Sequence, residues 1–386
     1  MLNTLNSEDL YYLCVTGENE LYTSSYLKIY KLIFLDLKLK NGYELLQKVN
    51  FDHFKRFIKM ASNFNTIDDF LQRMDKVNAD SLMRSFVKGM EGPNGLEDAV
   101  DVADSYASLP AIRLRSLIIE EVQKNLNQLK KSKNKMGSTI YGLLNTIFLS
   151  MDTANKIDIS ASLGIPPVYQ LNNRALQDST GKIIIQQFFY GDKDGQYEFG
   201  NFVKSYHKSN WKIIWKKDWV ELHSVKGKQV VIYSNRPLDE ENFLDIRAQE
   251  TLGKYLEQNK LRPTIVIHRG HSYYIKPTIR QLAPSAKLVL LGSCGGYNNL
   301  SQVIKTCPFV HIIATKQEGT GSINQPMIIY ITELLRQGKN FNWPAIWESF
   351  AEKFKGNKRF DDYIPPHQNL GAIFIMAYNT VMKNIN

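Results

Sequence analysis

The sequence predicts an α-helical N-terminal domain followed by a C-terminal α/β domain with a mostly parallel sheet. Apolar side chains recur with a helical period up to about residue 155, whereas short continuous apolar runs alternate with amphipathic segments after residue 180. Such runs, separated by helices, are typical of parallel strands that are buried on both faces. A chain of 386 residues is also long enough for two hydrophobic cores. We therefore expect a helical domain over residues 1–155, a linker over 156–180 and an α/β domain over 181–386.

The composition excludes several functional classes. No run of eighteen apolar residues occurs, so we expect no membrane span. Cys14, Cys294 and Cys307 form neither a disulfide framework nor a zinc motif, which predicts a reducing, cytoplasmic setting. The net charge is +10, but the lysines are scattered apart from a cluster at residues 130–135, so we expect no specific nucleic-acid partner.

Three segments of the first half have clear helical patterns. The segment "SSYLKIYKLIFLDLK" begins with serine cap candidates, and "TIDDFLQRM" begins with Thr66 and an acidic residue three positions later. The segment "LPAIRLRSLIIEEVQKNLNQLKK" ends in lysines, which suit the negative end of a helix dipole. Since no pattern in this half indicates a catalytic site, we expect it to bind a protein regulator or a substrate.

The second half begins where Gly164, Pro166 and Pro167 interrupt the helical pattern. We expect strands at residues 182–190, 211–215, 219–224, 228–234, 264–268, 287–291 and 310–315. Helices are expected between them and after them, at residues 196–208, 238–259, 275–282, 300–305, 325–337, 344–354 and 370–382.

A histidine and a cysteine follow two of these strands. His271 comes after the strand at 264–268, and Cys294 comes after the strand at 287–291. One short helix separates the two strands, so we expect them to be neighbours, about 4.8 Å apart. The carboxyl ends of parallel strands share one edge of a sheet, where ligands bind. The pattern therefore predicts an imidazole and a thiol above one crevice.

Nucleophilic catalysis uses this pair of groups. A free thiol has a pKa near 8.5, so a nearby imidazole is needed to take its proton or to hold the thiolate as an ion pair. The same imidazole protonates a leaving amine. Cys294 lies among Gly292, Ser293, Gly295 and Gly296, which permit a tight turn whose N–H groups are aimed at an oxyanion.

The two segments resemble the motifs of the caspase-like cysteine peptidases, the clan that contains caspases, gingipains, clostripain, separase and the CHAT domains. "VIHRGHS" is similar to the histidine motif of separase and CHAT domains, and "LVLLGSCGG" is similar to the cysteine motif. The resemblance covers roughly residues 181–350. It implies a cysteine endopeptidase that forms a thioester acyl-enzyme through His271 and Cys294, with the N–H groups of Ser272 and Cys294 as oxyanion donors. It requires no metal or organic cofactor, and its partner is a protein or peptide substrate.

One position departs from this family, and one residue competes for the role of the base. The family usually has glycine directly after the histidine, where this chain has Ser272. This departure leaves a second hypothesis open, in which the α/β domain is a catalytically inactive interaction module. His268 ends the apolar run itself, and we favour His271 because it lies beyond the strand and matches the motif.

A third hypothesis uses the same cysteine in another fold. "GSCGG" also fits the nucleophile elbow of α/β-hydrolases, which places an acid and then a histidine later in the chain. Asp361 or Asp362, with His367, fit that order. The gap between the two motifs has room for only one short helix, which argues against this fold.

Two loops are expected on the same edge of the sheet. The segment "YGDKDGQYE" contains Asp192 and Asp194 in a fragment of a calcium-loop pattern without the distal glutamate, so we expect an Asp-Gly turn and no metal. In the resembled family, loops on this edge recognise the residue before the cleaved bond. Asp192, Asp194 and Glu318, the last from "EGTGSINQ", are therefore candidates for the substrate pocket.

Overall fold

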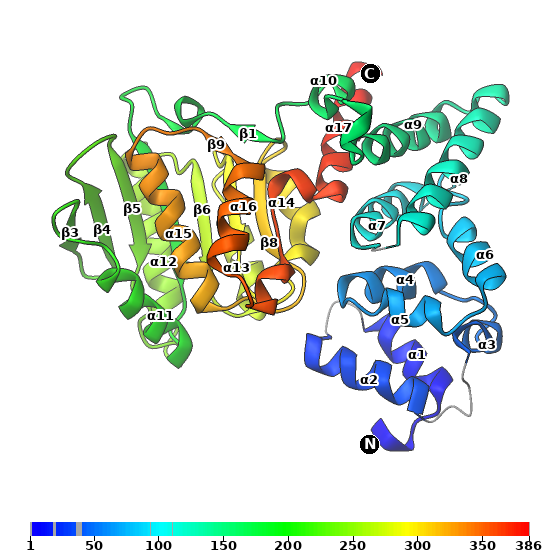
Figure 1. Ribbon diagram of the computed structural model, residues 1–386. Coiled ribbons are helices and arrows are strands. Elements are labelled where there is room, and N and C mark those ends of the chain that lie inside the picture. The colour runs from blue at the N-terminus through cyan, green and yellow to red at the C-terminus, as the bar shows by residue number, and fades with distance from the viewer. Residues whose placement is uncertain (1, 18–20, 36–40, 93, 110, 386) are drawn as a thin grey trace. The chain divides into compact units, whose positions relative to one another are not determined.

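The chain forms two compact units in the computed structural model, which describes residues 2–17, 21–35, 41–92, 94–109 and 111–385 (Figure 1). Unit 1 comprises Met1–Pro166 and Gln368–Asn386, and unit 2 comprises Pro167–His367. Positions 36–38 and 110, which fall within two of the expected helices, lie outside the described residues.

Unit 1 is helical throughout its described length. Several of its helices begin with a capping side chain, such as Asn6 in a capping box or Asp75 at the start of α6, because these oxygens satisfy the first free N–H groups. The helices are α1 (Ser7–Thr16), α2 (Thr23–Leu35), α3 (Gly42–Lys48), α4 (Phe54–Asn63), α5 (Ile67–Gln72), α6 (Lys76–Phe86), α7 (Gly95–Ser108), α8 (Ile112–Lys131), α9 (Lys135–Ser150), α10 (Ile159–Leu163) and α17 (Leu370–Ile385).

The boundaries of the units differ from those expected from the sequence. The last helix, α17, belongs to the helical unit, because it packs against α7 and α9 and its Gly371 N–H donates to the buried Asp104 carboxylate over 2.8 Å. The expected linker at 156–180 is divided between the units. Its α10 packs on α9, whereas its short strand β1 (Gln170–Leu171) pairs with β9 (Phe341–Asn342) in unit 2.

Unit 2 is a mixed α/β fold around an eight-stranded sheet with the order β10-β8-β7-β6-β2-β5-β4-β3. The central pairs from β8 to β5 are parallel, and β10, β4 and β3 add antiparallel edges. The strands are β2 (Ile183–Phe189), β3 (Trp211–Trp215), β4 (Trp219–Ser224), β5 (Val230–Asn235), β6 (Ile265–Arg269), β7 (Leu288–Leu291), β8 (His311–Thr315) and β10 (Tyr363–Ile364). The expected mostly parallel sheet is confirmed.

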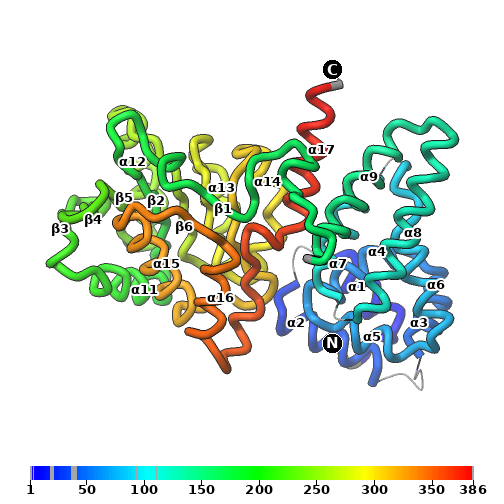
Figure 2. Tube along the Cα trace, turned by 45° about the horizontal axis from the view of Figure 1, so that its top comes forward, coloured from blue at the N-terminus to red at the C-terminus, as the bar shows by residue number. Residues whose placement is uncertain are grey.

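Helices cover both faces of this sheet (Figure 2). One face packs its apolar side chains against α11 (Lys193–Lys204), α15 (Gly321–Arg336) and α16 (Trp343–Lys353) in the main core of the unit. The other face is covered by α12 (Leu244–Gln258), α13 (Ile275–Arg280) and α14 (Leu300–Thr306). The strands β2, β6 and β7 are buried on both faces, which explains why they are nearly continuous apolar runs in the sequence.

The strands that precede His271 and Cys294 are neighbours, as expected. β6 and β7 pair in parallel with Ile265 opposite Leu288 and His268 opposite Leu291. After β2 the chain continues to strands on the β5 side of the sheet. After β6 it continues to β7, which lies in the opposite direction. Ligands bind in open α/β sheets at such a change of direction, at the carboxyl ends of the strands.

Within the described part of the chain, the helices are too short or too polar to cross a membrane.

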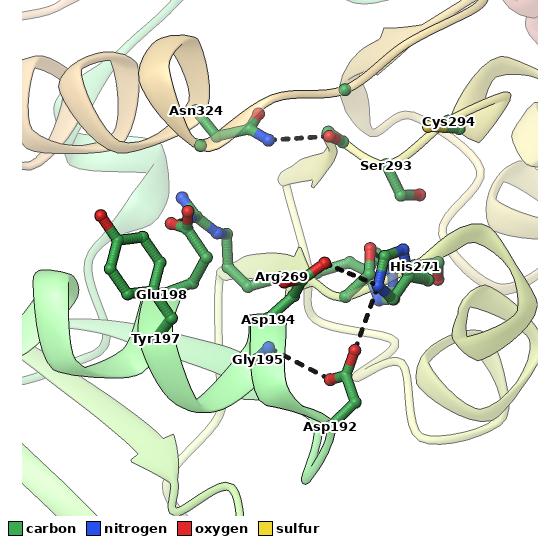
Figure 3. A pocket seen from close by; sticks show the side chains of 15 residues that line it. Asp192, Asp194, Gly195, Tyr197, Glu198, Arg269, His271, Ser293, Cys294 and Asn324 are labelled. Carbon is green, nitrogen blue, oxygen red and sulfur yellow. Dashed lines mark hydrogen bonds and ion pairs between the residues drawn. The ribbon is translucent and has the colours of Figure 1, made fainter.

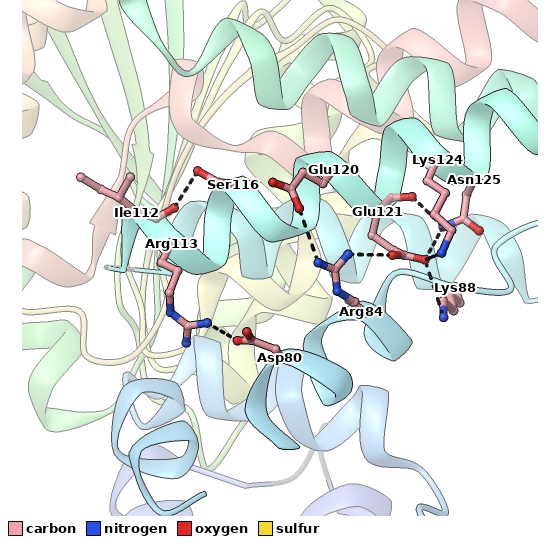
Figure 4. A network of polar contacts seen from close by, with 10 residues as sticks. All are labelled: Asp80, Arg84, Lys88, Ile112, Arg113, Ser116, Glu120, Glu121, Lys124 and Asn125. Atoms are coloured by element: carbon pink, nitrogen blue, oxygen red, sulfur yellow. Dashed lines mark hydrogen bonds and ion pairs between the residues drawn. The ribbon is translucent and has the colours of Figure 1, made fainter. Parts of the chain in front are cut away.

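A network of ion pairs joins α6 to α8 in unit 1 (Figure 4). The Glu121 carboxylate is only 1% exposed and lies within 4 Å of Arg84, Lys88 and Lys124. Glu120 beside it is 66% exposed and reaches only Arg84. Burial alone would raise the pKa of Glu121, but its three cations outweigh burial and lower it.

Glu121→Gln should destabilise unit 1 by about 1–3 kcal/mol, because it leaves three cations without their buried anion. Glu120→Gln is the matched control, and it should change the free energy of unfolding by less than about 0.5 kcal/mol. Urea unfolding followed by far-UV circular dichroism measures both variants. Equal losses in the two variants would contradict a special role for the buried carboxylate.

Candidate active site

A pocket of about 310 Å³ opens at the carboxyl edge of the sheet. Its walls come from the loops that follow four neighbouring strands, β2, β6, β7 and β8 (Figure 3). The residues that line it are Asp192, Asp194, Gly195, Tyr197, Glu198, His268, Arg269, Gly270, His271, Gly292, Ser293, Cys294, Gly319, Gly321 and Asn324. The pocket thus contains the predicted base, the predicted nucleophile and two of the three predicted substrate-pocket residues.

The loop that holds Cys294 is fixed through its carbonyl groups. The Gly292 carbonyl accepts from the Asn324 side chain over 2.7 Å, and the Ser293 carbonyl accepts from the Thr315 hydroxyl. The Gly295 N–H donates to Gln317 O over 2.9 Å. These three bonds tie the loop after β7 to the elements that follow it, and they leave the partly exposed Cys294 thiol at the pocket wall.

His271 lies beyond the end of β6 with 43% of its side chain exposed. Its Nε2 is 3.1 Å from Asp192 Oδ2 and 3.3 Å from Asp194 Oδ2. The ring also stacks on Tyr273, with centroids 5.3 Å apart. Among the described residues, no hydrogen bond joins this ring to the Cys294 sulfur. The His271 ring is therefore oriented by the two carboxylates, with the Cys294 thiol on another wall of the same pocket.

Asp192 is set in place by its role in the fold. It caps α11, and its Oδ1 accepts the Gly195 N–H over 3.1 Å. Burial raises the pKa of this carboxyl, against the opposing effects of the Gly195 N–H and of His271. The expected turn at 192–195 is thus the start of a helix, whose cap leaves the second carboxylate oxygen facing His271.

His268 is fully engaged in the core. Its Nδ1 is 2.8 Å from the Thr278 hydroxyl, and its Nε2 is 3.1 Å from Gly270 O. Burial lowers the pKa of its ring to about 4. Both ring nitrogens have partners, so His271 is the better candidate for moving a proton in the pocket.

Gly270 must remain glycine for His271 to keep its position. A Cβ at this residue would overlap the ring of Tyr190, which stacks on Tyr274 with centroids 4.0 Å apart. The Tyr190 hydroxyl in turn bonds to Thr278, the partner of His268.

We expect Gly270→Ala to destabilise unit 2 by about 1–3 kcal/mol, because a packed ring has to move. Gly200→Ala, in α11, is the control: nothing lies within 4 Å of its added Cβ, and the helix should gain about 0.5–1 kcal/mol. Urea unfolding followed by tryptophan fluorescence distinguishes the two. A loss at both positions would show that the space beside Tyr190 is not the cause.

Of the two predicted oxyanion donors, Cys294 lines the pocket and Ser272 does not. Within the described part of the chain, the N–H groups of Cys294 and Ser272 donate to no other group. Ser272 begins a short 3-10 helix with His271 at its cap position, so its N–H is one of the free donors of a helix start.

Several residues of the pocket were not predicted from the sequence. Arg269 is buried at the end of β6 and pairs with Glu198, while its Nη1 lies 3.4 Å from Gln325 Oε1. Glu198 lies one helical turn after Asp194, so the spacing of α11 places both on one face. That spacing was a usable signal, whereas nothing in the sequence marked Arg269 as buried.

The remaining predicted residues lie elsewhere. Glu318 is not among the lining residues, and its carboxylate pairs with Arg359 over 2.9 Å. Asp361, Asp362 and His367 are also absent from the pocket wall. The Asp362 carboxylate accepts the Glu318 N–H over 3.2 Å, and the His367 ring lies against Tyr169. The pocket thus gives no support to the elbow hypothesis.

Comparison with known proteins adds no family to this geometry: no family model, curated protein or solved structure matches the chain.

Proposed function

We propose that unit 2 is a cysteine endopeptidase in which Cys294 attacks the peptide carbonyl and His271 moves the proton. One observation carries the proposal: two adjacent parallel strands, β6 and β7, deliver His271 and Cys294 to the wall of one pocket. Neither residue would have weight alone, since a partly exposed cysteine or histidine is common. The strand order, with β6 and β7 between β2 and β8, is also consistent with the caspase-like resemblance.

The reaction would proceed through an acyl-enzyme. His271 takes the proton of the Cys294 thiol, the sulfur forms a bond to the carbonyl carbon, and the N–H groups of Cys294 and Ser272 receive the developing oxyanion. His271 gives a proton to the leaving amine as the peptide bond breaks, which leaves a thioester on Cys294. The same imidazole then deprotonates the water that hydrolyses the thioester. The Asp192 carboxylate, whose Oδ2 lies 3.1 Å from Nε2, would hold the ring in place during these steps.

The charges of the pocket favour a basic substrate side chain. Glu198 is neutralised by Arg269, but among the residues that line the pocket Asp192 and Asp194 form ion pairs only with the His271 ring. A lysine or arginine side chain before the cleaved bond would place a permanent positive charge beside them. We therefore propose basic residues as the preferred substrate class.

Asp192→Asn should lower the preference for lysine or arginine over neutral residues by about 10-fold, because a largely desolvated charge is lost. Asparagine keeps the oxygen that accepts the Gly195 N–H, so α11 keeps its cap. Asp194→Asn should have a smaller effect, since its side chain is 78% exposed and water screens its charge.

The ratio of kcat/KM for matched basic and neutral peptides measures this preference. Glu318→Gln is the control, because Glu318 lies outside the pocket and is already paired. A preference unchanged in Asp192→Asn, or lost equally in Glu318→Gln, would contradict the assignment.

Hydrolysis of a peptide library, analysed by mass spectrometry, tests the function itself. The wild-type protein should cleave a defined subset, and Cys294→Ala protein prepared in parallel should cleave none of it. If the two proteins leave identical libraries, unit 2 is better described as a non-catalytic interaction module, the hypothesis that Ser272 raised.

A further inference from the structure

We propose that Asp192, Asp194 and His271 form a zinc site that holds the pocket inactive. The Asp192 Oδ2, the Asp194 Oδ2 and a ring nitrogen of His271 all lie within 4.8 Å of one another. Zinc binding is independent of the peptidase proposal, whereas inhibition by zinc rests on it.

The two separations between the His271 ring and the carboxylates match a tetrahedral zinc ion. Ligand atoms about 2.0–2.1 Å from such an ion lie about 3.3 Å from one another. His271 Nε2 is 3.1 Å from one carboxylate oxygen and 3.3 Å from the other. The two carboxylates also neutralise a divalent charge, and an imidazole nitrogen among the donors favours zinc over calcium or magnesium.

The surroundings of the donors are built to orient them. Asp192 Oδ1 is occupied by the Gly195 N–H, which leaves Oδ2 for a metal, and the ring of His271 is stacked on Tyr273. Exposure of Asp194 and His271 gives the ion a path from solvent.

A buried hydroxyl in the same pocket is an independent sign of a polar ligand. Ser293 is 5% exposed, and its Oγ has no hydrogen-bond partner in the described structure. Its side chain points into the pocket from the end of β7 (Figure 3). A water bound to the zinc ion would supply the missing partner and complete the four ligands.

Zinc on His271 would stop peptide hydrolysis. The metal takes the lone pair of Nε2, so the imidazole no longer exchanges protons at that atom. It also neutralises the two carboxylates that would receive a basic substrate side chain. Zinc and a basic substrate therefore compete for the same wall of the pocket.

Calorimetric titration of Cys294→Ala protein with Zn²⁺ tests the site without the thiol as a ligand. We expect a one-to-one complex whose Kd rises at least about 10-fold in the added variants Asp194→Asn and His271→Gln. The control is Asp361→Asn, an exposed residue outside the pocket, which should bind as the parent does. Co²⁺ should give the visible absorption bands of a tetrahedral site in the parent protein only. Absence of a complex, or equal affinity in all four proteins, would overturn the proposal and leave an ion pair only.

A second measurement addresses inhibition. Zn²⁺ should inhibit peptide hydrolysis by the wild-type protein, EDTA should restore it, and Asp194→Asn should need at least about 10-fold more zinc for half inhibition of its own activity. Unchanged inhibition in Asp194→Asn would place the inhibitory zinc on Cys294 and overturn the proposal. If wild-type protein hydrolyses no peptide, the peptidase proposal fails, while the calorimetric result still decides the zinc site.

Discussion

Cys294→Ala should lower kcat/KM for peptide hydrolysis by at least about 10⁴-fold, because the thiol that forms the acyl-enzyme is lost. His271→Ala should cause a loss of similar size, since the amine then leaves without a proton donor. The double variant should be no worse than either single variant, because nucleophile and base act as one unit. Initial rates on the best library peptide measure all three.

The controls for this prediction separate the competing hypotheses. Cys307→Ala removes a buried thiol whose pKa is raised by burial to about 11, so its rate should stay within about 2-fold of wild type. His367→Phe should be equally neutral, because His367 lies outside the pocket. A large loss in His367→Phe with a retained rate in His271→Ala would instead favour the elbow hypothesis. A rate unchanged in Cys294→Ala would refute the nucleophile.

The adjacency of the two catalytic candidates could be predicted because it depends on local signals. An apolar run of four or five residues that ends in small polar residues marks a buried strand and its carboxyl end. One short helix between two such runs leaves room only for a crossover to a neighbouring strand. The parallel pairing of β6 with β7 agrees with those constraints.

The surroundings of His271 could not be predicted in the same way. Asp192 and His271 are far apart in sequence, and both Asp-Gly turns and helix caps use aspartate after a strand. Only the position of β2 beside β6 in the sheet brings the carboxylate to the ring. That strand order depends on the connection from β5 to β6, which crosses β2. The hydrophobic pattern of the sequence does not indicate this crossover.

The assignment of the last helix shows a related limit. An apolar stripe at residues 370–382 predicts a helix, and α17 confirms it. The stripe does not say which core will bury it, because both units offer apolar surfaces of similar composition. In the structure α17 packs against α7 and α9. The Asp104 carboxylate of α7 accepts the Gly371 N–H from the first turn of α17. The sequence alone does not show which group would form a hydrogen bond with a buried acid in α7.

Acidification from pH 6.5 to pH 4 should destabilise unit 2 by about 3–6 kcal/mol, because three of its histidines are held neutral. Burial lowers the pKa of His268, His311 and His367 to about 4 each. The unfolded chain binds protons on these rings near pH 6.5, whereas the folded chain does not. Stability is therefore lost as the pH falls through this window. Water reaches His311 and His367 in part, so each contributes less than the roughly 3 kcal/mol of His268.

Asp362 opposes this loss of stability on acidification. Its substitution should therefore change the pH dependence in the direction opposite to that of a histidine substitution. Burial raises the pKa of its carboxyl to about 6, so its contribution to stability is present below the unfolded value of 3.8 and is lost as the pH rises through 6. Asp362→Asn keeps an oxygen for the Glu318 N–H. This variant should gain up to about 3 kcal/mol at pH 8, and the gain should vanish near pH 4.

Urea unfolding followed by tryptophan fluorescence isolates unit 2, because every tryptophan of the chain lies in it: Trp211, Trp215, Trp219, Trp343 and Trp347. His311→Asn keeps an acceptor for the Trp343 indole N–H, which donates to His311 Nδ1 over 2.9 Å, and should flatten the pH dependence. Asp362→Asn should steepen it, and the exposed His207→Asn should leave it unchanged. If His311→Asn and His207→Asn follow the wild-type curve alike, the acid sensitivity comes from groups other than the neutral histidines. If the pH dependence changes in the same direction in His311→Asn and Asp362→Asn, the two substitutions act through packing. Only titration gives effects of opposite sign in the same pH window.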